Sequence, residues 1–208
     1  LEKALLAISA RAGARTVPAL LPLAHNTDSR MRIVALSLLA SAGGPHALEA
    51  VQLAIQDKDE AVQDEAVRTL STWPNNWPED SNVAQPLLTL AKSGAKPSHQ
   101  VLALRGYFQY LQGDKQLRGD EKLGKISEAW PLIKRLEEKR QALAVIVAVP
   151  NARALDMLAG FIPEPDLTED ACSAIVRLVE SSAQSLPQEQ RLKALQTVVQ
   201  KTANETTK

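Results

Sequence analysis

Aromatic residues are scarce in this chain, at 3% of 208 residues, whereas alanine and leucine are abundant. Small and unbranched side chains of this kind suit the close packing of helices. Cysteine is almost absent too, because Cys172 is the only one. No intramolecular disulfide can therefore form, and cysteine usage does not decide between an oxidising and a reducing compartment.

Net charge is also lacking, because 24 Lys and Arg residues balance 24 Asp and Glu residues. A neutral chain has no long-range attraction for a polyanion. The most basic stretch, Lys92 to Arg140, contains interleaved acids such as Glu121 and Glu128, and few aromatic residues that could stack on bases. We therefore do not expect nucleic acid as a partner.

No apolar run approaches the roughly twenty residues that a membrane span needs. The longest, Ala142 to Val149, is followed directly by Pro150, so we expect no membrane span. The chain begins at Leu1 rather than Met. We expect it to be part of a larger protein in which a signal peptide or another domain precedes it.

Residues for catalysis or metal binding do not gather in the sequence. His25, His46 and His99 are the only histidines, and they fall near turns far apart in the chain. Neighbouring acids such as Asp64 and Glu65 point in different directions on a helix and form no general acid/base pair. We expect no catalytic residue, no metal site and no cofactor.

A pattern of apolar residues recurs at about 31 residues, which is typical of repeat proteins. The first copy consists of Asp28, Met31, Ala35, Leu36 and Leu39, and the second of Asp59, Val62, Ala66, Val67 and Leu70. Each copy reads as a turn acid followed by an amphipathic helix.

The pattern predicts an all-α fold, a right-handed α-solenoid of stacked antiparallel helix pairs in one domain over residues 1–208. The expected units are a truncated repeat at 1–13, pairs at 17–43, 46–73, 83–111, 121–149 and 152–183, and a capping helix at 188–203. The proline-rich stretch from Trp73 to Pro78 interrupts the rhythm, so we expect a loop there, at which the stack bends or widens.

These residues resemble HEAT repeats, in which a Pro-x-Leu-Leu helix, an Asp turn and a Val-Arg helix follow one another. The matching residues are Pro18-Ala19-Leu20-Leu21, Asp28, Met31-Arg32, Asp59, Val62-Gln63 and Pro86-Leu87-Leu88. The chain is also similar to HEAT-like segments of large exported proteins of planctomycetes and their relatives. That resemblance implies an armadillo-like superhelix and an exported or periplasmic bacterial protein.

Aligned second helices predict two ladders of polar residues. One contains Arg32, Gln63, Gln100 and Arg140, and the other contains Ser37, Arg68 and Arg105. The ladders could recognise an extended partner, or each side chain could bond the turns of neighbouring repeats. We favour the structural interpretation.

Trp73 and Trp77 are candidates for contact with a sugar ring or a peptide, because a proline-stiffened loop holds them. The alternative, which we favour, is that both indoles fill the gap where the repeat spacing slips.

The leading hypothesis is a non-catalytic, monomeric scaffold that binds a protein partner or a neighbouring domain of its parent chain. The candidate contacts are Arg32, Arg68, Arg105, Arg140, Trp73 and Trp77. Two alternatives stay open. One is an enzyme on a HEAT-like fold, such as an alkylpurine DNA glycosylase or a bilin lyase, and the other is a carbohydrate-contacting accessory module.

Overall fold

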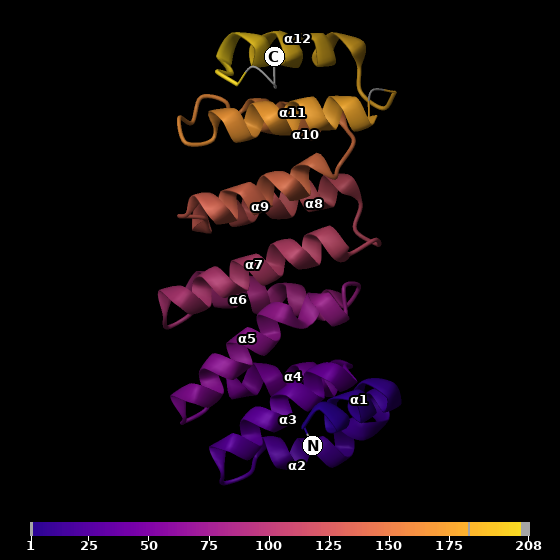
Figure 1. The fold of residues 1–208 in the computed structure, drawn as a ribbon, viewed down its shortest axis with the longest axis vertical. Coiled ribbons are helices and arrows are strands. Elements are labelled where there is room, and N and C mark those ends of the chain that lie inside the picture. Colours follow the sequence, from indigo (N-terminus) through magenta and orange to yellow (C-terminus); the bar gives the residue numbers. More distant parts are fainter. Residues whose placement is uncertain (1, 183, 205–208) are drawn as a thin grey trace. The chain divides into compact units, whose positions relative to one another are not determined.

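The computed structural model describes residues 2–182 and 184–204, and every regular element in this part of the chain is a helix (Figure 1). The prediction of an all-α protein is therefore confirmed. Contacts divide the chain into two compact units, unit 1 (Leu1–Asp114) and unit 2 (Lys115–Lys208), where the sequence had suggested one domain. Each unit buries an apolar core of its own.

Unit 1 is built from helices that pair in chain order. They are α1 (Glu2–Ala12), α2 (Val17–Ala24), α3 (Ser29–Ala42), α4 (Pro45–Ala54), α5 (Glu60–Asn76), α6 (Ala84–Ser93) and α7 (Pro97–Gly113), with 3-10 turns η1 (Gly13–Thr16) and η2 (Ser81–Val83). Helix α2 packs on α3, α4 on α5 and α6 on α7, while α3, α5 and α7 pack on one another in sequence. Figure 1 shows these helices one above another.

The two copies of the sequence pattern have the same local structure. Asp28 and Asp59 are the N-caps of α3 and α5, and each carboxylate accepts a 2.9 Å hydrogen bond from the backbone N–H two residues on. These bonds satisfy backbone donors at the helix start. The equivalent alanines Ala35 and Ala66 are both fully buried. The recurrence therefore reflects equivalent caps and equivalent core positions.

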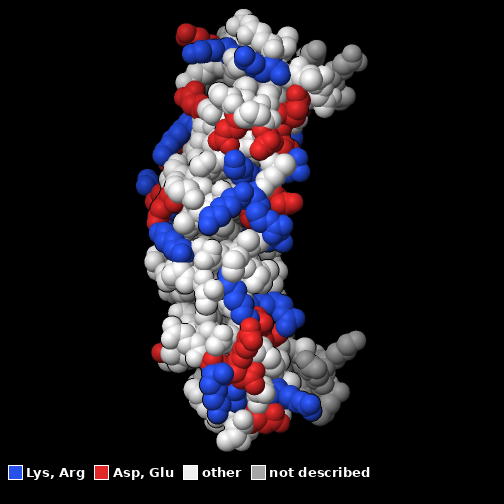
Figure 2. All heavy atoms as spheres, turned by 90° about the vertical axis from the view of Figure 1, so that its left-hand side faces the viewer, with Lys and Arg blue, Asp and Glu red and all other residues white. Residues whose placement is uncertain are grey.

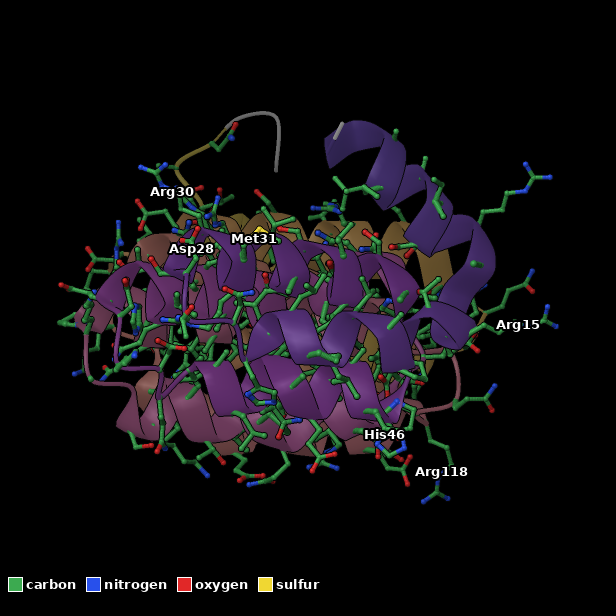
Figure 3. The ribbon with its side chains drawn as sticks, turned by 90° about the horizontal axis from the view of Figure 1, so that it is seen from below. Arg15, Asp28, Arg30, Met31, His46 and Arg118 are labelled. Carbon is green, nitrogen blue, oxygen red and sulfur yellow. The ribbon has the colours of Figure 1, made fainter. Side chains whose placement is uncertain are left out.

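Two kinds of turn lie at opposite ends of these helices. In Figure 3, Asp28 and Arg30 lie at the start of α3, while His46 lies near its far end. Gly43 and Gly44 connect α3 to α4 with φ of 71° and 89°, a region that only glycine adopts easily. The glycine pair therefore ends α3 and reverses the chain.

Helix α5 is longer than the sequence predicted, and the loop that follows it is shorter. Helix α5 continues through Pro74 to Asn76, although the sequence predicted a loop from Trp73. Pro74 is buried among the helices, and Trp77 N–H bonds the Trp73 carbonyl to close the last turn. Tertiary packing here outweighs the cost of a proline that cannot donate a backbone hydrogen bond.

One helical stretch of unit 1, Ala4–Ala24, is long and apolar enough to cross a membrane by length and composition alone. Arg11 and Arg15 interrupt its apolar residues, so the stretch is not a continuous apolar run. The stretch is not one straight helix. Gly13, the first residue of η1, has φ of 60°, and both α1 and α2 pack on α3.

Unit 2 contains α8 (Gly119–Ala129), α9 (Leu136–Val147), α10 (Ala152–Ala159), α11 (Thr168–Ser182) and α12 (Gln188–Lys201), with a 3-10 turn η3 (Trp130–Leu132). Helix α11 packs on α9, α10 and α12. The connection from α8 to α9 begins with η3, in which Trp130 keeps helical geometry (φ −52°, ψ −44°) although Pro131 follows it, and Ile133 is the first extended residue. Trp130 stacks there on Phe161 with ring centroids 4.1 Å apart.

Helix α12 is the helix that the sequence assigned as a cap. Terminal repeats of solenoids usually present a polar outer face. Here Leu192 and Val199 are each 53% exposed. The last helix of unit 2 therefore has apolar side chains on its exposed side.

Candidate functional site

Arg32, the first residue of the first predicted ladder, is buried rather than displayed. Its guanidinium binds the carboxylate of Asp57 through two hydrogen bonds, Nε to Oδ2 at 2.9 Å and Nη2 to Oδ1 at 2.8 Å. The third nitrogen, Nη1, donates to the carbonyls of Asn26 and Thr27 at 2.8 and 3.2 Å. Arg32 thus ties the α2–α3 turn to the next turn, as the structural interpretation expects.

The other members of this ladder also bond to turns. Gln63 Nε2 donates to the Asp57 carbonyl at 2.6 Å, and Gln100 Nε2 donates to the Gly94 carbonyl at 2.9 Å. Arg32, Gln63 and Gln100 therefore each reach a carbonyl six residues before them. In unit 2, Arg140 Nε donates instead to Asp170 Oδ2 at 2.9 Å.

The second ladder contains the side chains that reach the surface. The Arg68 side chain is 67% exposed, and its guanidinium pairs with the nearly buried carboxylate of Glu65 on the same helix. Ser37 and Thr69 also donate to this carboxylate, at 3.5 and 3.3 Å. Arg105, at the matching position of α7, is partly exposed. Because α5 and α7 pack together, Arg68 and Arg105 lie on neighbouring second helices.

Trp73 belongs to the core of unit 1. Its side chain is 1% exposed, and Nε1 donates to Asp80 Oδ2 at 3.0 Å. The Asp80 carboxylate also accepts from the backbone N–H of Asn82 and so caps η2. Trp73 therefore fastens the α5–α6 connection to α5.

Trp77 covers the end of α3. Its Nε1 donates to the Ala40 carbonyl at 2.8 Å, which satisfies one of the carbonyls left unpaired at a helix C-terminus. The ring lies so close to Gly43 that a Cβ at that position would collide with it. Both indole N–H groups are therefore occupied within the chain, as expected if the tryptophans fill the gap between repeats.

Figure 2 shows acidic side chains close to basic ones on the side of each unit that faces the viewer. In unit 1, Lys96 Nζ lies 2.5 Å from Glu60 Oε1 and 2.6 Å from Asp64 Oδ1. In unit 2, Lys139 pairs with Glu164 at 2.7 Å. In these pairs, Lys96 and Lys139 of the base-rich stretch are each neutralised by a carboxylate.

The structure contains a polar cluster of Asp64, Lys96 and His99 that the sequence did not predict. His99 is buried, and its Nε2 lies 2.7 Å from the same Asp64 oxygen that Lys96 binds. Hydrogen bonds from Lys96 and then from His99 hold the pKa of Asp64 below its usual value. The signal in the sequence is Lys96-Pro97, which stands where the first two repeats have a turn acid and supplies a cation to Glu60 and Asp64 of α5.

Residues for metal or thiol chemistry do not converge in the part of the chain that the structure describes. No group of three or more His, Cys, Asp or Glu side chains could hold a metal ion there. Cys172 is buried, and its burial, together with the charge of Glu169, raises the pKa of the thiol.

Comparison with protein-family models and with curated proteins finds no match to this sequence.

Proposed function

We propose that this chain is a HEAT-type α-solenoid that acts as a non-catalytic scaffold for a protein partner or for a neighbouring domain of its parent protein. The observation that carries the proposal is the set of bonds from Arg32, Gln63 and Gln100, each to the carbonyl six residues earlier. Three successive helix pairs that close their turns in one way are what a repeat architecture requires.

The proposed contact surface is the second-helix face of unit 1, defined here by Arg68 on α5 and Arg105 on α7. An exposed guanidinium offers several donors in a fixed geometry to a carboxylate of a partner. The ion pair with Glu65 already restricts the Arg68 side chain. Arg68 therefore loses less conformational freedom on binding a partner than an unpaired arginine would. At the rim of an interface such charges contribute orientation more than affinity.

The alternatives find less support in the contacts. A carbohydrate platform would need exposed tryptophan faces, whereas Trp73 is buried and Trp77 lies on Gly43. A DNA glycosylase would need a continuous basic groove, whereas acidic side chains lie among the basic ones on the face in Figure 2.

The test compares capture of partners by wild type and by an Arg68→Gln, Arg105→Gln double variant. Glutamine removes both charges without placing an acid beside Glu65. The matched control is Arg11→Gln, Arg30→Gln, since both arginines are exposed on other helices. We expect one partner to be crosslinked by the wild type and the control, and to be lost in the double variant. Equal capture by all three proteins would show that the partner does not bind the face defined by Arg68 and Arg105.

A further inference from the structure

Helix α1, the first helix of unit 1, turns two large apolar side chains away from the core. Leu5 is 38% exposed and Ile8 is 59% exposed. Among residues 4–12, the one buried side chain is that of Ser9, which is 4% exposed. Helices at the surface of a globular protein normally show the opposite arrangement, with apolar residues facing the core. The exposed side of α1 is therefore a candidate interaction surface.

The exposure continues through the following turn into α2. Within Ala4–Ala24, only Ser9, Val17 and Leu20 are buried, although this stretch is long and apolar enough to cross a membrane by length and composition. It forms no straight spanning helix, because Gly13 redirects the chain and both α1 and α2 pack on α3. A helix held on a folded unit in this way can lie along a membrane surface without crossing the membrane.

The charged residues of this stretch are all basic. Between Glu2 and Asp28 the sequence contains no Asp or Glu. Arg11 in the last turn of α1 and Arg15 in η1 are both exposed, and Figure 3 shows Arg15 extending away from the helices. Neither guanidinium forms an ion pair with a side chain that the structure describes. Both charges are therefore available to an anionic partner.

Arg11 lies beside the exposed apolar residues of α1. Ala4, Ile8 and Arg11 are spaced by four and three residues within this helix, so they share one face. At a membrane surface, an arginine keeps its guanidinium among the headgroups while its methylene groups lie against apolar material. Apolar residues together with basic ones, and without acids, form the combination that anionic membrane surfaces attract.

Other occupants fit this surface less well. A second copy of the chain would bring no carboxylate from the same stretch to Arg11 or Arg15. A folded protein partner needs a shape to fit, whereas the residues that surround Leu5 and Ile8 are mostly exposed alanines, namely Ala4, Ala7, Ala10 and Ala12. A lipid surface needs no matching shape, and it offers many negative charges at once.

We propose that α1 and η1 bind the surface of a membrane that contains anionic lipids. Leu5 and Ile8 enter the boundary between headgroups and acyl chains, and Arg11 and Arg15 contact the phosphates of the headgroups. This surface and the Arg68–Arg105 face lie on different helices, so either proposal can fail without the other.

The test is cosedimentation of the full chain with vesicles. One set of vesicles contains phosphatidylglycerol and phosphatidylcholine in equal amounts, and the other contains phosphatidylcholine alone. We expect binding to the anionic vesicles that weakens as salt is added, and much weaker binding to the neutral vesicles. Binding to neither set, or equal binding to both, would overturn the proposal. With no binding at all, the exposed side of α1 would be left to a protein contact.

The apolar contribution is measured with a Leu5→Ser, Ile8→Ser variant. It should partition into the anionic vesicles about tenfold more weakly than the wild type, because two apolar side chains no longer leave water. The matched control is Leu53→Ser, Leu192→Ser, two leucines that are exposed on α4 and α12. The control should bind like the wild type, and circular dichroism checks that both variants keep their helices.

The electrostatic contribution is measured with an Arg11→Gln, Arg15→Gln variant. Its partitioning should also be about tenfold weaker, since each basic residue near an anionic surface adds to the attraction. The matched control, Lys58→Gln, Lys134→Gln, removes the same charge from exposed positions elsewhere and should bind like the wild type. If either α1 variant bound as tightly as its control, the proposal would be wrong.

Discussion

The guanidinium of Arg32 is buried and joins two successive turns of unit 1. Its side chain is 6% exposed and that of Asp57 is 14% exposed. A charge in such a place is tolerable only while its partner is present, since the paired charges and the carbonyl acceptors replace the lost water. Arg32 is therefore a residue on which the stability of unit 1 depends.

Replacing Arg32 with Met should lower the free energy of unfolding by about 3 kcal/mol, because Asp57 is left without its ionic partner. Arg30→Met is the matched control. Arg30 is exposed two residues away, and its substitution should stay within about 0.5 kcal/mol of wild type. Urea denaturation measures both. A loss at Arg32 no larger than that at Arg30 would show that the pair contributes nothing.

The same pair predicts a dependence on pH. Burial raises the pKa of Asp57, but hydrogen bonds from Arg32 and from the Asp59 N–H outweigh it, so the pKa lies below its usual value. The carboxylate therefore stabilises the fold above its unfolded pKa of about 3.9, and this contribution is lost as pH falls through the folded pKa.

Between about pH 5 and about pH 3, the stability difference between wild type and Arg32→Met should consequently shrink. Urea denaturation at several pH values in this range measures the free energy of unfolding of both proteins. A difference that stays constant with pH would mean that the pKa of Asp57 does not depend on Arg32.

The contact between helices α5 and α7 depends on one glycine. Gly106 of α7 lies against the backbone of Ser71 in α5, and a Cβ at Gly106 would be 2.5 Å from the Ser71 carbonyl oxygen. Backbone atoms cannot move aside as a flexible side chain can. The close approach of the two helices thus requires a residue without a side chain.

Gly106→Ala should destabilise the protein by about 1–3 kcal/mol through overpacking, although alanine is the better helix former. Gly124→Ala is the matched control, because Gly124 also lies in a helix, α8, and a Cβ there meets nothing within 4 Å. That variant should gain about 0.5–1 kcal/mol. Thermal unfolding followed by circular dichroism separates the two signs, and a stabilised Gly106→Ala would disprove the packing argument.

On the scale of the whole molecule, the chain divides into two compact units with the boundary after Asp114. The residues that follow are non-helical up to α8, and Lys115 and Arg118 are both exposed. Exposed connections of this kind are preferred sites of proteolysis. The boundary between the two units should therefore be detectable by limited proteolysis of the isolated protein.

Limited digestion with trypsin should cut first among internal sites at Lys115 or Arg118, and yield two large fragments that keep their helical circular dichroism. Lys58 and Lys92 lie in the turns and helices of unit 1 and should be cut later. Mass spectrometry of the early products decides the order. Early cleavage at Lys58 would contradict the division into these two units.

The helical class and the starts of helices α3 and α5 could be predicted from the amino-acid sequence. Capping by Asp28 and Asp59, reversal at Gly43-Gly44 and apolar spacing are local properties, which depend on a few neighbouring residues. The equivalence of Arg32, Gln63 and Gln100 also followed from alignment, because each bonds a carbonyl of its own turn.

Which polar residues are buried depends on contacts between segments far apart in the chain. The partner of Arg32 lies 25 residues away, and that of His99 lies 35 residues away. Pro74 stays helical because neighbouring helices bury it. Such features arise from the packing of distant segments, which no local pattern specifies.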